Sequence, residues 1–201
     1  MFENRATHAR SAAHEVALDC LTAGIRGADP ERATREALAL TGADLEIATG
    51  KRSLVDLSAF DRVLVLGGGK AAPGIVRALE SGLGDRLSDG IVVVPEDHPD
   101  ADTTIGPVSV EPGGHPVPTA AGADATDRLL DLADGADEST LVLSVITGGA
   151  SALLASPAGE LTVEELREAT RSLLDAGADI ESANAVRKHA SRVKGGRLAA
   201  A

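Results

Sequence analysis

The sequence has 201 residues, a formal net charge of −12 from 31 acidic and 19 basic side chains, 43% hydrophobic residues and only two aromatic residues, both Phe. This composition supports one domain with an aliphatic core and argues against a nucleic-acid partner, because an acidic surface repels phosphate backbones and aromatic rings for base stacking are scarce. The single Cys20 excludes an internal disulfide and a cysteine-based metal cluster.

The sequence contains no apolar run near the ~20 residues that cross a membrane, and the N-terminus lacks the apolar segment of a signal peptide. We therefore expect a cytoplasmic protein without a membrane partner. Four Lys against fifteen Arg, with an excess of acid, is typical of proteins from salt-loving archaea. Dense carboxylates keep such surfaces hydrated when salt screens their repulsion.

The N-terminal quarter predicts two helices and a hairpin. Apolar residues recur at helical spacing over residues 8–23, and Gly24 follows as a stop signal. Asp29 and Pro30 are typical first residues of a second helix, which we expect to reach about Leu40. Residues 45–57 predict two short strands that form a hairpin at a sheet edge.

The remaining sequence alternates strands with helices. Strands are expected at 62–66, 91–95, 108–111 and 141–147, and helices at 73–83, 124–132, 152–155, 162–177 and 180–194. The last strand is apolar apart from Ser144, which predicts burial on both faces. Thr162 and Glu165 form a capping-box pattern at a helix start. This order predicts an α/β fold, a three-layer α/β/α, Rossmann-like domain with a mainly parallel sheet.

A glycine loop follows the first core strand, with Gly67, Gly68 and Gly69 before Lys70. The spacing is not that of a Walker A loop, but it fits the G-x-G-x-x-A dinucleotide pattern, with Glu96 or Asp97 placed to bind a ribose. In a second interpretation, the Lys70 ammonium neutralises a phosphoryl group during its transfer. A solvated turn lysine is the structural alternative.

A second loop of small residues follows the last core strand. Thr147, Gly148, Gly149 and Ser151 form a loop whose backbone N–H groups can approach an anion closely. An ordinary β-to-α turn explains the same residues equally well. Ser151 is also placed to cap the short helix expected at 152–155.

Further candidate residues lie in a proline loop and in the last helix. His115 is a candidate substrate contact or base, although a purely structural role in its turn is favoured. Glu181, Asn184 and Lys188 fall on one helix face, with Arg187 beside them. A solvated, salt-bridged face is the alternative. The histidines lack partners at ligand spacing, so no protein metal site is predicted.

Four strings in this order give the chain a family resemblance: LGGGKAAPGI, GGHPVPTAAG, TGGASALLASPAGELTVEEL and LLDAGADIESANAVRKHASRVKGGRLA. The chain resembles the glycerate 2-kinases of the two-domain type that end in a MOFRL domain. The resemblance implies transfer of the ATP γ-phosphoryl group to the 2-hydroxyl of D-glycerate, with Mg²⁺ on the phosphates. It departs from the family pattern at Ala150, Thr147 and Thr119, where we expect Gly, Ser and Asp.

The resemblance also implies roles for the candidate residues. Lys70 and Arg187 would be catalytic, and residues 67–69 and 147–151 would bind the nucleotide phosphates. His115, Glu181, Asn184 and Lys188 would bind substrate, with Arg187 and Lys188 on the glycerate carboxylate or the phosphates. Residues 1–201 would then be an incomplete N-terminal α/β domain that lacks the MOFRL domain. Its sheet would have an unpaired edge that favours homo-oligomers.

Two other functions are consistent with the sequence. The first is an NAD(P)-dependent hydroxypyruvate reductase, based on the pattern from Gly67 to Ala72 together with Glu96. The second is a non-catalytic remnant that binds a nucleotide.

Overall fold

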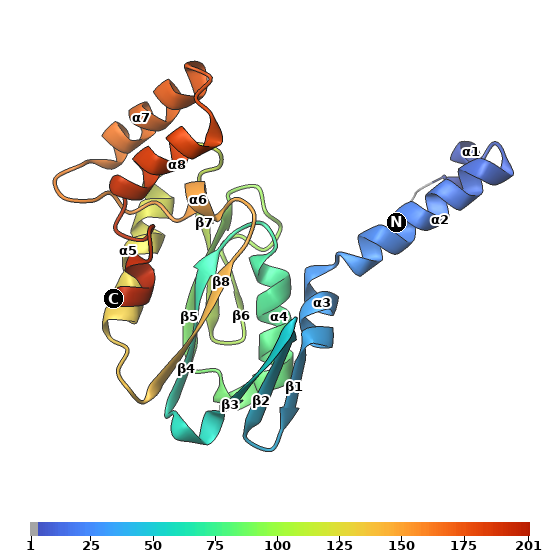
Figure 1. The fold of residues 1–201 in the computed structure, drawn as a ribbon, viewed down its shortest axis with the longest axis horizontal. Helices are drawn as coiled ribbons and strands as arrows, with labels where there is room; N and C mark the ends of the chain where they lie inside the picture. The colour runs from blue at the N-terminus through green and yellow to red at the C-terminus, as the bar shows by residue number, and fades with distance from the viewer. Residues whose placement is uncertain (1–3) are drawn as a thin grey trace.

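The computed structural model describes residues 4–201 as an α/β body with a helical arm (Figure 1). The elements follow in the order α1 (Arg5–His8), α2 (Ala12–Gly27), α3 (Pro30–Ala37), β1 (Leu38–Thr41), β2 (Asp44–Thr49), β3 (Lys51–Asp56), β4 (Arg62–Gly68), α4 (Ala72–Leu83), β5 (Asp89–Pro95), β6 (Thr103–Ile105), β7 (Val108–Gly113), α5 (Ala120–Asp134), β8 (Thr140–Ile146), α6 (Ala150–Leu153), α7 (Val163–Asp175) and α8 (Ile180–His189). Short 3₁₀ turns lie at Leu57–Ala59, Gly84–Arg86 and Arg197–Ala200.

The central sheet has five strands in the order β6-β7-β5-β4-β8. The four strands from β7 to β8 run parallel, and only the short β6 is antiparallel to its neighbour. Apolar strands buried on both faces are the expected component of a parallel sheet, and β4 and β5 are of this kind. The mixed α/β fold with a mainly parallel sheet that the sequence predicts is therefore confirmed.

Helices cover both faces of this sheet. On one face, α4 packs through Val76, Leu79 and Leu83 against Val65 and Val92 of the two central strands. On the other face, α5 packs against the same two strands and against α6. The alternation of side chains along each strand supplies both cores from β4 and β5. These two strands are therefore the rigid support for any group at their carboxyl ends.

The last strand, β8, differs from its prediction. It pairs with β4 along its whole length, and it is the outer strand of the sheet in the described part of the chain. Val142 is 37% exposed and Ile146 is 59% exposed. The expectation of burial on both faces was wrong because an apolar run cannot distinguish a central strand from an edge strand whose apolar side chains stay uncovered.

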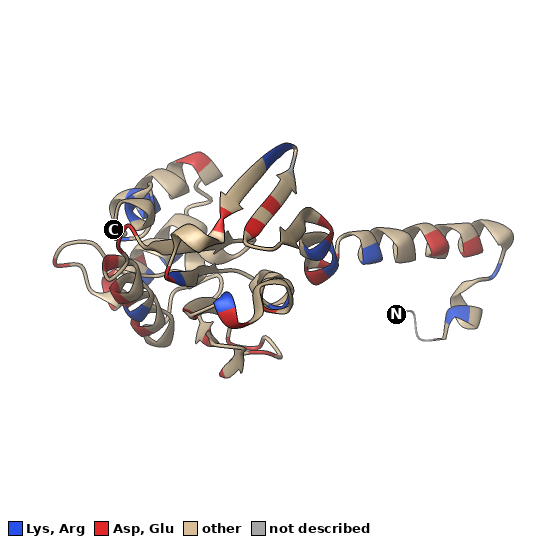
Figure 2. Ribbon diagram, turned by 90° about the horizontal axis from the view of Figure 1, so that it is seen from below, with Lys and Arg blue, Asp and Glu red and all other residues tan. Residues whose placement is uncertain are grey.

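The N-terminal elements form an arm that leaves the body (Figure 1). Helix α2 has no buried residue and continues through the predicted stop at Gly24 to Gly27, whereas Asp29 caps α3 as expected. The predicted hairpin exists as β2 and β3. It does not extend the central sheet, because β1 joins it in a separate antiparallel sheet. Acidic and basic residues both lie on the arm and on this hairpin (Figure 2).

The C-terminal helices α7 and α8 lie side by side beyond the central sheet (Figure 1). The capping box is confirmed, because Thr162 and Glu165 exchange side-chain and backbone hydrogen bonds. The prediction that the last helix reaches Lys194 was wrong, because α8 ends at His189 and the chain then turns back toward α6. None of the described helices has the length and apolar character needed to cross a bilayer.

Candidate functional site

The candidate site lies where the sheet changes its direction of winding. The chain adds β5 and β7 on one side of β4 and then places β8 on the other side. In open parallel sheets, ligands bind in the crevice at the carboxyl ends of the strands on either side of such a switch. The loops that follow β4 and β8 are those that contain Lys70 and Gly149. The topology therefore brings the two predicted phosphate loops together.

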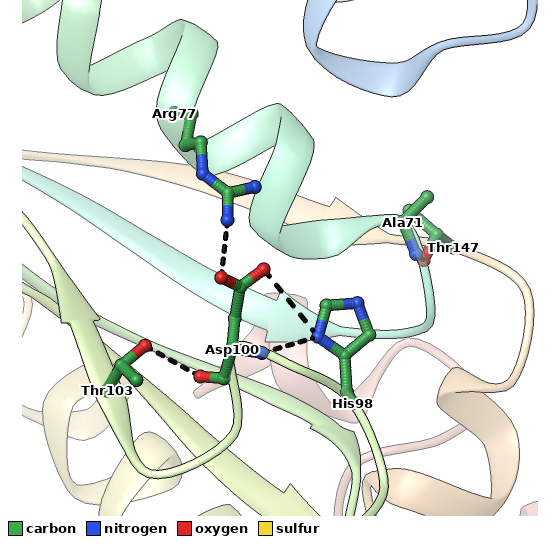
Figure 3. Close-up of polar contacts among 6 residues, drawn as sticks. All are labelled: Ala71, Arg77, His98, Asp100, Thr103 and Thr147. Carbon is green, nitrogen blue, oxygen red and sulfur yellow. Dashed lines mark hydrogen bonds and ion pairs between the residues drawn. The ribbon is translucent and has the colours of Figure 1, made fainter. Parts of the chain in front are cut away.

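Hydrogen bonds join these two loops directly. The N–H of Lys70 donates to the carbonyl of Gly148 at 2.9 Å, and the N–H of Thr147 donates to the carbonyl of Gly68 at 3.0 Å. The N–H of Ala71 donates to the Thr147 hydroxyl at 3.2 Å (Figure 3). At Gly69, which has a φ of 123°, a Cβ would collide with this hydroxyl and with the Thr147 carbonyl. Close approach of the loops therefore requires glycine there.

The backbone donors of the first loop are already used. The N–H of Gly69 donates to Val93, that of Lys70 to Gly148, that of Ala71 to Thr147 and that of Ala72 back to Gly69. Gly67 and Gly68 lie inside β4, where they pair with both neighbouring strands. The backbone from Gly67 to Gly69 is therefore held by the neighbouring strands and does not offer free N–H groups to phosphate, contrary to the prediction.

The second loop retains free donors. Within residues 4–201, the backbone N–H groups of Gly148, Gly149 and Ser151 have no hydrogen-bond acceptor. Thr147 is tied down by its bonds to the first loop, so its hydroxyl and N–H are occupied. Successive free backbone N–H groups are the kind of donor that binds phosphate oxygens in proteins. Of the two predicted loops, only the second keeps free backbone N–H groups among residues 4–201.

Ser151 has a different place from the one predicted. Helix α6 begins at Ala150 with Gly149 as its N-cap, so Ser151 is the second helical residue and does not cap the helix with its side chain. Gly149 takes this position because its φ of 97° suits a residue without a side chain. The Ser151 side chain is exposed, and it makes no hydrogen bond with any described residue.

Lys70 and His115 lie on the exposed side of these loops. Lys70 has no carboxylate partner among the described residues, so its ammonium is available to an anion. The His115 ring lies against Gly149, where an added Cβ would be 3.2 Å from the imidazole Cδ2. Lys70 thus follows β4, and His115 contacts the loop that follows β8.

Arg187 approaches the same region from the C-terminal helices. It lines a narrow hollow together with Ser151, Lys194 and the two prolines that follow His115. Lys194, which was not among the predicted site residues, donates from Nζ to the carbonyl of Leu154 at 2.8 Å. Burial and the nearby Arg187 charge lower the pKa of Lys194 to about 8. Lys194 follows Arg187 by seven residues, a spacing that places two residues on the same face of a helix. The predicted helix was wrong for Lys194, because α8 ends at His189 and Lys194 lies beyond it.

The other residues predicted on the last helix do not join this hollow. Glu181, Asn184 and Lys188 lie on α8 with exposed side chains. Of the residues of α8, Arg187 alone lines the hollow at Ser151. The Lys188 stem lies against Gly195, where an added Cβ would be 2.7 Å from Cε. The structure therefore separates Arg187 from its three predicted companions.

The loop after β5 is fixed by its own polar contacts. Arg77 of α4 pairs with Asp100 at 2.5 Å, and the backbone N–H of Asp100 donates to His98 Nδ1 at 3.1 Å (Figure 3). Glu96 and Asp97 precede these residues and are exposed at the carboxyl end of β5. The position expected for a ribose-binding carboxylate thus exists next to β4.

The comparisons with known proteins place the chain in a family. Residues 16–201 match the model of the domain of unknown function DUF4147. A D-glycerate 2-kinase of Thermotoga maritima is 34% identical over 174 residues, which cover 85% of this chain and 41% of that protein. A protein of Agrobacterium vitis named "Putative hydroxypyruvate reductase" is 36% identical over 140 residues, covering 70% of this chain and 31% of that protein.

A solved structure agrees with these matches. The crystal structure of a protein from Pyrococcus horikoshii superposes with a TM-score of 0.80 at 32% identity and covers 94% of this chain and 41% of that one. The chain thus spans about two fifths or less of the length of these relatives. Because the family model matches almost the whole sequence, the chain belongs to the DUF4147 family.

Proposed function

We propose that this chain is the phosphate-binding N-terminal domain of an ATP-dependent glycerate 2-kinase of the MOFRL type, with a three-layer, Rossmann-like arrangement. The observation that carries the proposal is the group at the carboxyl ends of β4 and β8. Among residues 4–201, Lys70 after β4 has no carboxylate partner, and three N–H groups after β8 have no acceptor. The D-glycerate 2-kinase name of a relative supports the reaction, and the 41% share of that relative supports a further domain.

In the proposed reaction, the 2-hydroxyl oxygen of D-glycerate attacks the γ-phosphorus of ATP and the bond to the β-phosphate oxygen breaks. The N–H groups of Gly148, Gly149 and Ser151 bind the phosphate oxygens. The Lys70 ammonium offsets the charge on the transferred group, which is the main task of a protein in phosphoryl transfer. His115, over Gly149, lies at the edge of this donor set and contacts the substrate.

The expected Mg²⁺ is not provided for by the described residues. They contain no group of three or more His, Cys, Asp or Glu side chains that could hold a metal ion. The groups that face the loops are N–H donors and cations, which do not fit a metal. We propose that Mg²⁺ arrives on the ATP phosphates, as is usual for this ion, and assign no step to it.

A second candidate is an NAD(P)-dependent hydroxypyruvate reductase. The name of the Agrobacterium relative and the exposed Glu96 at the end of β5 favour it. The hydrogen bonding of the first loop argues against it. A dinucleotide fingerprint presents free N–H groups to the pyrophosphate at the strand-to-helix turn. Here the N–H groups of residues 69 to 72 are all bonded within the protein.

An experiment on the chain extended through its downstream reading frame separates these functions. ADP release and NADH absorbance are followed in parallel, with D-glycerate and ATP in one assay and hydroxypyruvate and NADH in the other. The kinase predicts ADP formation that requires D-glycerate. NADH oxidation without ADP would establish the reductase, and ATP binding without turnover would establish the non-catalytic remnant.

A further inference from the structure

The ammonium group of Lys194 lies between the candidate site and the C-terminal segment. The chain leaves α8 at His189, and a bridge between Pro157 and Ser191 holds it beside the segment that follows α6. This places Lys194 with its Nζ 2.8 Å from the carbonyl oxygen of Leu154. An ammonium has three N–H donors, and only this one acceptor is present among residues 4–201. Two donors therefore remain for a ligand.

Lys194 and Arg187 form a pair of cations without a counter-charge. Both line the narrow hollow at Ser151, whose volume of about 10 Å³ admits a single oxygen of an anion. Neither has a carboxylate within ion-pair distance in the described part of the chain. Burial, and to a smaller extent repulsion by the Arg187 charge, lower the pKa of Lys194 to about 8. A half-buried cation pair of this kind is unfavourable without an anion.

No described residue near Lys194 and Arg187 supplies a negative charge that pairs with either of them. Helix α7 contributes the uncharged Leu166 and Thr170 to the hollow. From α5, Asp127 is bound by the Arg192 guanidinium at 3.1 Å and by the Ser156 hydroxyl at 2.7 Å. The guanidinium of Arg197 is held by backbone carbonyls, and Ala201 lines the wider hollow on the other side of Lys194 without pairing with it.

We propose that Lys194 and Arg187 together bind the polyphosphate of the phosphoryl donor beside Ser151. Lys194 is then a residue that binds the nucleotide phosphates. The inference rests on the proposed function, since it names the substrate that this part of the site takes. Two adjacent cations require more than one negative charge to be compensated. A single carboxylate such as that of glycerate neutralises one of them, whereas a triphosphate neutralises both. Inorganic tripolyphosphate carries the same phosphate chain without adenosine and cannot be used to phosphorylate glycerate in a binding assay, so it tests polyphosphate binding alone.

Titration calorimetry of the 201-residue chain with tripolyphosphate tests the proposal at low ionic strength and pH 7. Lys194→Gln should weaken binding by about 10- to 100-fold, as expected for losing hydrogen bonds from a charged donor. The matched control is Lys51→Gln, the same change at an exposed lysine of the hairpin, which should leave the affinity within about twofold because exposed charges are screened. Unchanged tripolyphosphate binding by Lys194→Gln, or stronger dependence of D-glycerate binding on Lys194, overturns the assignment.

The pH dependence gives a second measurement that does not require Lys194→Gln to fold. With a pKa near 8, Lys194 loses its charge at alkaline pH, so wild-type affinity should fall between about pH 8 and 10. Lys194→Arg keeps its charge over this range, so the ratio of its affinity to that of wild type should rise between about pH 8 and 10. The ligand's own ionisation cancels in this ratio. Parallel pH profiles for both proteins would show that Lys194 does not contact the anion. These measurements report binding and not kinase activity. A wrong assignment of Lys194 can therefore be distinguished from a wrong proposed reaction.

Discussion

The backbone N–H of Lys70 donates to the carbonyl oxygen of Gly148 at 2.9 Å, which joins two loops that are far apart in the sequence. This bond fixes the lysine backbone after β4 against the loop after β8. The Lys70 side chain is exposed, while the neighbouring N–H groups after β8 stay free. The bond therefore brings the backbone of Lys70 next to the loop with the free N–H groups. In the proposed function, the ammonium and these N–H groups together stabilise the transferring phosphoryl group.

Replacing Lys70 tests this arrangement. In the extended enzyme, Lys70→Ala should lower kcat by about 10²-fold or more, because it removes a charge directed at the transition state. The free energy of unfolding should change little, since the side chain is exposed. Steady-state ADP release and chemical denaturation would be measured on the same preparations, with Lys51→Ala as control. Turnover close to wild type for Lys70→Ala would refute the catalytic role.

The close contact of the two loops predicts different stabilities for two glycine substitutions, one in each loop. Gly69→Ala should destabilise the fold by about 2–4 kcal/mol, because its Cβ would collide with Thr147 and its φ of 123° is strained for alanine. Gly148→Ala is the matched control, because an added Cβ there meets nothing within 4 Å. Urea denaturation followed by circular dichroism measures both. Equal stabilities for the two variants would mean that the loops are not in contact.

The lowered pKa of Lys194 has a consequence for stability. Burial favours the neutral amine in the folded state, so between about pH 8 and 10.5 the unfolded chain binds more protons and stability rises with pH. Below pH 8 the full cost of charging the amine is present. Lys194→Met should therefore raise the free energy of unfolding by about 2 kcal/mol at pH 7. This gain should shrink toward pH 10.5. A variant that is less stable than wild type at pH 7 would show that the ammonium stabilises the fold.

The acidic composition predicts a dependence on salt. With a net charge of −12, self-repulsion opposes the compact state until salt screens it, over a Debye length of about 3 Å in molar salt. We expect the thermal transition, followed by circular dichroism, to broaden and move to lower temperature as KCl is reduced from molar concentration to dilute buffer. The same transition temperature in both buffers would contradict a halophilic protein.

The sequence predicted the central strands well because their signal is local. The apolar runs of β4 and β5 are buried on both faces because both strands are central in the sheet. The same signal failed for β8, because only the position of a strand in the sheet decides whether Val142 and Ile146 are covered. The short β6 was missed because three residues give no periodicity to detect.

The sequence predicted the two loops of the candidate site, but not which N–H groups stay free or where Lys194 lies. The two glycine loops stood out in the sequence, and their juxtaposition follows from the parallel sheet. Which loop keeps free N–H groups depends on bonds between residues about 80 positions apart, such as Thr147 to Gly68. Lys194 was misplaced because helical periodicity does not reveal that α8 ends at His189. Long-range pairing, which no local pattern encodes, therefore decides which residues can bind the anion.

The exposed edge of the sheet predicts the behaviour of the 201-residue chain. Strand β8 has β4 as its only neighbour among the described residues, and its apolar side chains Val142 and Ile146 are 37% and 59% exposed. An apolar edge with unpaired backbone groups pairs with other chains. We expect the chain to oligomerise in light-scattering chromatography and to show no glycerate kinase activity, because phosphoryl transfer needs a closed site from which water is excluded.

A charge on this edge should reverse the association. Ile146→Lys places an ammonium on the exposed strand, and such charges prevent edge-to-edge pairing in natural sheets. Leu174→Lys is the matched control, because this leucine is 50% exposed on helix α7, where no strand edge is available. The expected result is a monomer for Ile146→Lys and an oligomer for both the control and the wild type. A monomeric wild-type chain that phosphorylates glycerate would show that the edge does not mediate association and that the site is complete within residues 1–201.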